Sequence, residues 1–244
     1  MEITTDPTPR PLPALPAGVD RLPRGVIVSH QRDRVLVSAI EVFASRGYRA
    51  TTIDHLVGAS HTGVGSFYAL FDGKEDCFLR AYNRIIEAAS ARIAAAIPAA
   101  APWRERTRAA LEALLNWIAA EPAEARIGLV EAQRAGPAAL ARYETTLERL
   151  ASLLRDGRTR SSTGRELPLS HEHATVAGVA WLLNERLQEG EPSGIGALLP
   201  DLLEIVIAPY FEGETQTTQG APGFAPERGA ASAAAGAILV GSAP

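Results

Sequence analysis

The chain has 244 residues, of which 46% are hydrophobic and 21% charged, and its formal net charge is −4. This balance is typical of a globular protein with one large domain or two small ones. The sequence lacks an apolar stretch near the roughly 20 residues that span a bilayer, and it does not begin like a secretory signal. The single cysteine, Cys77, excludes a disulfide framework and a cysteine-rich zinc site within one chain. We therefore expect a cytoplasmic protein that does not enter a membrane.

Both ends of the chain differ in composition from its middle. Residues 1–25 are rich in proline, which predicts a disordered arm, and residues 213–244 are of low complexity, which predicts a disordered tail. Residues 24–84 contain eight basic and six acidic residues. This small positive surplus suits a segment that contacts phosphates.

The middle of the chain shows helical periodicity almost throughout, beginning with a helix that Gly47 ends. Residues 72–75 resemble a capping box before one long helix, which Pro98 and Pro102 interrupt. A further helix precedes Pro122, and Pro122 and Pro137 are placed as first-turn prolines of two more. These elements and the absence of strand-like alternation predict an all-α protein.

The last third of the chain continues the helical pattern. Residues 157–167 are polar and rich in arginine, which predicts a loop. We expect Ser170 to cap a helix that Gly190 closes. A last apolar helix is predicted from residue 195 to 211, with a bend at Pro200.

Residues 48–76 contain two short apolar patterns separated by the turn 60–63. Thr51 or Thr52 can cap the first helix, with Asp54 completing a capping box. Two short helices of this kind, braced by a preceding amphipathic helix, fit a helix-turn-helix whose second helix enters the major groove of DNA. Short helix pairs also occur as plain packing units, so periodicity alone leaves that alternative open.

Residues 31–82 resemble the N-terminal domain of TetR-type (tetracycline-repressor-like) transcriptional regulators. The matching residues are Gly47-Tyr48, Thr51-Thr52-Ile53, Phe67-Tyr68, Phe71 and Lys74-Glu75. The resemblance implies a three-helix DNA-binding domain at residues 26–72. It also implies a helical ligand-binding and dimerisation domain at residues 73–212.

The same resemblance indicates the residues that face DNA. They are Thr51, Thr52, Gly63, Val64, Gly65, Ser66, Tyr68, Ala69 and Lys74. Thr52, Tyr68 and Lys74 are expected to contact phosphates, although a cap, a packed ring and a solvated lysine are the respective alternatives.

The turn departs from the family pattern at three positions. His61 stands where the family has a glycine, and histidine tolerates left-handed backbone better than most residues. Gly63 replaces a hydroxyl cap, and Val64 replaces a polar residue that would read bases. Base specificity is therefore expected from Ser66, from the backbone near Gly63 and Gly65, and from DNA shape.

The C-terminal half carries the residues expected to line a ligand pocket. They are Trp103, Trp117, Arg126, Tyr143, Trp181 and Asn184. Aromatic residues at helical spacing are more often part of a core, so the prediction of a pocket depends on the family resemblance. The pattern contains no catalytic constellation, and the spacing of His171 and His173 is poor for a shared metal. We expect no enzyme activity, metal or cofactor.

Together these features predict a homodimeric regulator that represses transcription from a palindromic operator. A small hydrophobic ligand would release it from double-stranded DNA. The dimer is expected to form through residues 170–190 and 195–211, which are the most apolar late segments. A helical protein–protein adaptor, or a ligand-binding bundle without a DNA function, is the alternative.

Overall fold

The computed structural model describes residues 24–190 and 192–211, and every regular element in these ranges is helical. The first four helices are α1 (Arg24–Arg46), α2 (Ile53–Ser60), α3 (Val64–Leu70) and α4 (Lys74–Ala96). The remaining α-helices are α5 (Trp103–Ala120), α6 (Pro122–Leu129), α7 (Pro137–Leu154), α8 (Ser162–Glu166), α9 (His171–Glu189) and α10 (Leu199–Val206). The 3₁₀ turns are η2 (Glu131–Gln133), η3 (Arg155–Thr159), η4 (Pro192–Leu198) and η5 (Ala208–Tyr210). The all-α prediction is confirmed for these residues.

The predicted arm and tail lie outside the described residues, apart from Arg24 and Gly25, with which α1 begins. None of the described helices combines the length and the hydropathy that crossing a bilayer requires.

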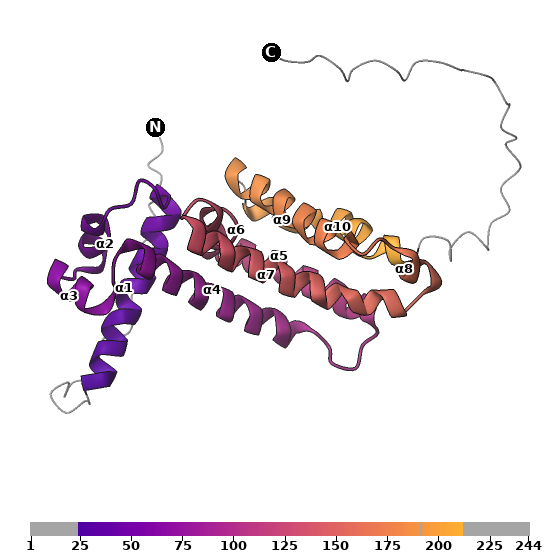
Figure 1. The fold of residues 1–244 in the computed structure, drawn as a ribbon, viewed down its shortest axis with the longest axis horizontal. Helices are drawn as coiled ribbons and strands as arrows, with labels where there is room; N and C mark the ends of the chain where they lie inside the picture. Colours follow the sequence, from indigo (N-terminus) through magenta and orange to yellow (C-terminus); the bar gives the residue numbers. More distant parts are fainter. Residues whose placement is uncertain (1–23, 191, 212–244) are drawn as a thin grey trace, which may run out of the picture. The chain divides into compact units, whose positions relative to one another are not determined.

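Helix α1 is the element that joins the two parts of the fold. It packs against α2 and α3, and also against α4 and α6. Figure 1 shows α2 and α3 beside α1 at one end, while α4, α7, α9 and α10 run away from them in roughly one direction. Helices α5 and α6 pack on α4, and α7 packs on α9. The short helices α2 and α3 therefore project from a larger bundle.

Buried aromatic side chains hold the first four helices together. Phe43 of α1, Phe67 of α3 and Phe78 of α4 are fully buried, as is Leu56 of α2. The rings of Phe43 and Phe78 meet edge to face with their centroids 5.2 Å apart, a favourable geometry for aromatic pairs. Because each helix contributes a large side chain to this cluster, the position of α3 depends on α1 and α4.

Several local predictions differ from the structure. Ser170 is the N-cap residue of α9, but its side chain makes no cap hydrogen bond. Residues 157–167 are not a plain loop, since they contain most of η3 and all of α8. Pro200 lies in the first turn of α10, where its missing N–H costs nothing, and so it begins a helix instead of bending one. Helix α4 has Gly73 as its N-cap, without a side-chain cap; instead, the N–H of Asp72 donates to the carboxylate of Asp76 at 3.2 Å.

Candidate DNA-binding site and ligand cavities

Helix α2 begins at a reciprocal cap. The Thr52 hydroxyl accepts the N–H of His55, and the N–H of Thr52 donates to Nδ1 of His55 at 3.2 Å. This is a capping box, but its third-position partner is His55, where Asp54 was expected. The box satisfies two backbone donors and leaves Thr52 on the surface.

The turn between α2 and α3 depends on one left-handed residue. His61 has φ 50° and ψ 41°, and its N–H donates to carbonyl oxygens at the end of α2. It is the only non-glycine residue with positive φ among those described. The predicted left-handed histidine is confirmed. Gly63 then serves as the N-cap of α3 without a side-chain hydrogen bond.

Helix α3 has a buried side and an exposed side. Phe67 and Leu70 point into the core. The exposed residues are Gly63, Val64, Gly65, Ser66, Tyr68 and Ala69. Tyr68 is 54% exposed and Val64 is 47% exposed, although both are large and apolar in part. This exposed face of α3, defined by these six residues, contains most of the positions predicted to face DNA.

The glycines of this face are not required by packing. A Cβ atom built on Gly63 or Gly65 would meet no other atom within 4 Å. Neither glycine has a positive φ. Neither space nor backbone conformation therefore requires glycine at these two positions.

Two residues predicted to contact DNA make hydrogen bonds within the chain. Thr51 is 1% exposed, and its hydroxyl donates to the carbonyl oxygen of Gly47 at 2.8 Å. Lys74 is half-buried, and its ammonium donates to the carbonyl oxygens of Tyr48 (3.0 Å) and Thr51 (2.9 Å). The Lys74 Nζ also lies 4.3 Å from the centre of the Tyr48 ring. Both side chains therefore hold the connection between α1 and α2, which places the exposed face of α3.

A buried carboxylate that the sequence analysis did not single out supports the same connection. Glu131 of η2 is 2% exposed, and its Oε2 accepts the N–H of Tyr48 at 2.7 Å. Gly47, with φ 78°, lies directly beside this carboxylate. The partners are 83 residues apart, so no local pattern could have indicated the contact.

The six residues expected to line a common pocket do not converge on one cavity. Trp103 is buried against Tyr210, with ring centroids 4.9 Å apart. Trp117 is buried on α5, and its indole N–H donates to Glu124 at 3.4 Å. Tyr143 is buried, and burial raises the pKa of its hydroxyl. These three side chains belong to the core and do not line a pocket. A core position was the alternative interpretation of their aromatic spacing.

The other three residues lie nearer the surface. Trp181 is 62% exposed on α9, so it does not line an internal cavity of this chain. Asn184 donates to the carbonyl oxygen of Leu129 at 3.3 Å. Arg126 borders a cavity of about 240 Å³ between α1, α6 and α9. The residues lining that cavity are Glu41, Ala44, Ser45, Pro122, Ala123, Arg126 and Leu187.

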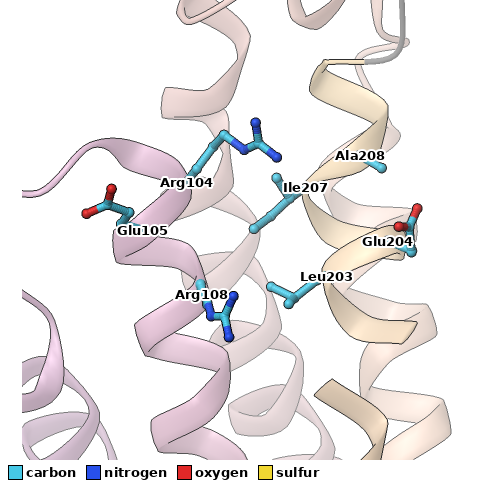
Figure 2. A pocket seen from close by; sticks show the side chains of 7 residues that line it. All are labelled: Arg104, Glu105, Arg108, Leu203, Glu204, Ile207 and Ala208. Atoms are coloured by element: carbon cyan, nitrogen blue, oxygen red, sulfur yellow. The ribbon is translucent and has the colours of Figure 1, made fainter. Parts of the chain in front are cut away.

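A second cavity, of about 290 Å³, lies between α5 and α10. We call it the α5–α10 groove; it is lined by Arg104, Glu105, Arg108, Leu203, Glu204, Ile207 and Ala208. Figure 2 shows Arg104 and Arg108 reaching from α5 towards Ile207, which directly follows α10, and Leu203 of α10, while Glu105 points away. The groove therefore combines an apolar wall with two guanidinium groups, and the carboxylates of Glu105 and Glu204 also border it.

The C-terminal end of the described bundle is fixed by a buried ion pair. Glu172 is 1% exposed and accepts from Arg158 Nε at 2.7 Å and from the Tyr210 hydroxyl at 3.2 Å. Burial opposes ionisation of Glu172, but the hydrogen bonds that its carboxylate accepts from Arg158, from a backbone N–H and from Tyr210, with the charge of Arg158, together outweigh it, and the pKa of this carboxyl lies below its ordinary value. This cluster joins η3, α9 and η5.

Sequence comparisons agree with the geometry of the first four helices. Residues 35–81 match the family described as "Bacterial regulatory proteins, tetR family". The HTH-type transcriptional activator FasR of Mycolicibacterium smegmatis is 28% identical over 103 residues, which are 42% of this chain and 47% of FasR. The match thus spans about half the length of that curated relative.

Solved structures extend the likeness to the remaining helices. The fatty acid degradation regulator FadR of Bacillus halodurans is 16% identical with a TM-score of 0.64, over 72% of this chain and 94% of FadR. AibR, solved with isovaleryl coenzyme A and operator DNA, is 14% identical with a TM-score of 0.60, over 72% of this chain and 97% of AibR. These proteins share the fold. Residues 35–81 thus match the tetR family of bacterial regulatory proteins, and the helices behind them share the fold of these solved structures.

Proposed function

We propose that the chain is a transcriptional regulator that binds double-stranded operator DNA through α2 and α3. The exposed face of α3 carries this proposal, because it is uncharged, contains two glycines and is not used for packing. Such a face lets a helix backbone approach the edges of bases in the major groove. Thr52, at the N-cap of α2, and Tyr68, on this face, are exposed and carry hydroxyl groups that suit contacts with phosphates.

The effector we propose is an acyl thioester of coenzyme A, which releases the regulator and thereby relieves repression. FadR is named for fatty acid degradation, and AibR was solved with isovaleryl coenzyme A. In this chain, Leu203 and Ile207 of the α5–α10 groove suit an acyl chain. Arg104 and Arg108 in the same groove suit phosphate groups. The groove holds only part of such a ligand at about 290 Å³.

We further propose that two chains pair through α9. The residues first expected at that interface, including Val179, Ala180 and Leu183, are buried within the chain. The outward side of α9 instead shows Ala174, Ala177, Gly178 and Trp181, all exposed. A stripe of small residues ending in a 62% exposed tryptophan is a surface that a second helix covers well. A two-fold dimer places two α3 helices for a palindrome.

DNA selection tests the core of this proposal. The full chain is mixed with a random pool of duplexes, and the retained duplexes are sequenced. We expect a palindrome whose affinity falls as salt rises. Replacing Tyr68 by Phe should weaken binding about fivefold for every retained sequence, because one hydrogen bond to a phosphate is lost. A chain that retains no duplex above non-specific competitor would favour the adaptor function.

Ligand titration tests the effector separately. Acetyl-, octanoyl- and palmitoyl-coenzyme A are added to the complex with the selected duplex. The active compound should lower the affinity of the chain for DNA by a certain factor. DNA should lower the affinity of the chain for that compound by the same factor. The Arg104→Ala/Arg108→Ala variant should lose that response. Arg106→Ala is the matched control, because Arg106 is exposed on the same helix and does not line the groove.

A further inference from the structure

The exposed face of α3 lacks the side chains that make the strongest base contacts. Guanine is usually read by Arg or Lys, and adenine by Asn or Gln. Helix α3 reads Val-Gly-Ser-Phe-Tyr-Ala-Leu and contains none of these four residue types. Since Phe67 and Leu70 are buried, base contacts from α3 are limited to Val64, Ser66, Tyr68 and Ala69.

Val64 is the most apolar of these, and the described part of the chain covers only about half of it. It is 47% exposed, and no described contact with the core explains a branched apolar side chain there. The apolar group that the major groove offers is the 5-methyl group of thymine. Gly63 and Gly65 flank Val64, and the space beside both is open. Their small size allows the Val64 side chain to approach the base edges closely.

We propose that Val64 is a specificity-determining residue that reads thymine through its 5-methyl group. This inference rests on the proposed DNA-binding function and adds the chemistry by which one base is chosen. Ser66 contributes a hydroxyl that can donate to or accept from any base, so it discriminates less. The contacted position in each half of the operator is therefore a thymine, and the pairing is apolar.

Uracil substitution tests the inference, because deoxyuridine lacks only the 5-methyl group. Each thymine of the selected palindrome is replaced by deoxyuridine in both halves, one symmetric pair at a time. At one symmetric pair, the replacement should lower the affinity of the parent chain for the duplex on the order of tenfold, because two buried methyl groups are lost. Val64→Ala should bind the thymine and uracil duplexes equally. Leu150→Ala, which changes a 44% exposed leucine on α7, should retain the parent's discrimination.

The outcomes separate this inference from the function on which it rests. Equal binding of thymine and uracil duplexes by the parent chain, on a palindrome that it selects, would overturn the role of Val64 and leave DNA binding intact. Discrimination that persists in Val64→Ala would do the same. Circular dichroism of each variant confirms that the helices are retained. A parent chain that selects no duplex overturns both proposals.

Discussion

The carboxylate of Glu131 accepts the backbone N–H of Tyr48 at 2.7 Å, across 83 residues of sequence. The carbonyl oxygen of Tyr48 is held from the other direction by Lys74 of α4. Tyr48 lies in the connection that leads from α1 into α2. Glu131 of η2 and Lys74 of α4 thus hold the two peptide units on either side of the Tyr48 Cα atom, at the start of the helix-turn-helix.

We predict that Glu131→Ala weakens DNA binding although Glu131 is remote in sequence from α3. The variant leaves the N–H of Tyr48 without its partner, at a cost of about 1–3 kcal/mol for a buried donor. Hydrogen exchange of the Tyr48 amide should accelerate, and Glu131→Gln, which keeps an acceptor oxygen, should restore most of its protection. Unchanged protection of the Tyr48 amide in Glu131→Ala would contradict this role.

Gly65→Ala should stabilise the protein and impair its function. Alanine is favoured over glycine in a helix by about 0.5–1 kcal/mol, and the space at Gly65 is open. The free energy of unfolding should therefore rise, while affinity for the selected duplex should fall because the added methyl group holds α3 away from the bases. Gly196→Ala, at another open glycine, is the control for DNA binding. Parent-like DNA affinity of Gly65→Ala would show that close approach is not needed there.

Trp181→Arg should convert a dimer into monomers. The exposed indole would be replaced by a charge within the proposed α9 interface, where an unpaired ion is costly. Light scattering at micromolar concentration should give twice the chain mass for the parent and one chain mass for the variant. Val64→Arg, which places the same charge on α3, should keep the parent's mass. A monomeric parent would refute the proposed interface directly.

The ion pair of Glu172 and Arg158 makes a predictable contribution to stability. Because the folded pKa of Glu172 lies below its ordinary value of 4.5, this contribution is complete above that pH and is lost as pH falls through the folded pKa. Arg158→Met should lower the free energy of unfolding at pH 7 by about 3 kcal/mol, since it leaves a buried carboxylate unpaired. Denaturant unfolding from pH 3 to 7 measures both effects. Glu172→Gln should reduce the acid sensitivity; an unchanged pH profile would show that other carboxylates dominate.

Features that depend on near neighbours in sequence could be predicted. The helices follow from apolar spacing, Gly47 ends α1 with positive φ, and Pro122 and Pro137 lie in first turns as expected. The left-handed His61 could also be inferred, because the turn geometry constrains the residue there. Each of these signals acts within one helix or one turn.

Features that depend on distant partners could not be predicted in the same way. The sequence predicts that Lys74 contacts phosphates. In the structure, its ammonium donates to the carbonyl oxygens of Tyr48 and Thr51, which lie near it only because the α1–α2 connection is folded. Helical spacing also does not say which apolar side of α9 the chain covers itself. Spacing therefore predicts Val179 at the dimer interface and Trp181 in the pocket. In the structure, Val179 is buried within the chain and Trp181 is exposed.

Cys77 is the chain's one cysteine, and its thiol is completely enclosed by the protein. Burial, with a smaller contribution from Asp76, raises its pKa to about 12, so the reactive thiolate is scarce at neutral pH. A cysteine introduced at the exposed Ala50 would then be the one group that takes a maleimide fluorophore or a nitroxide. The native sequence is thus already a suitable background for site-specific spectroscopy, and the motion of the helix-turn-helix during ligand binding becomes directly observable.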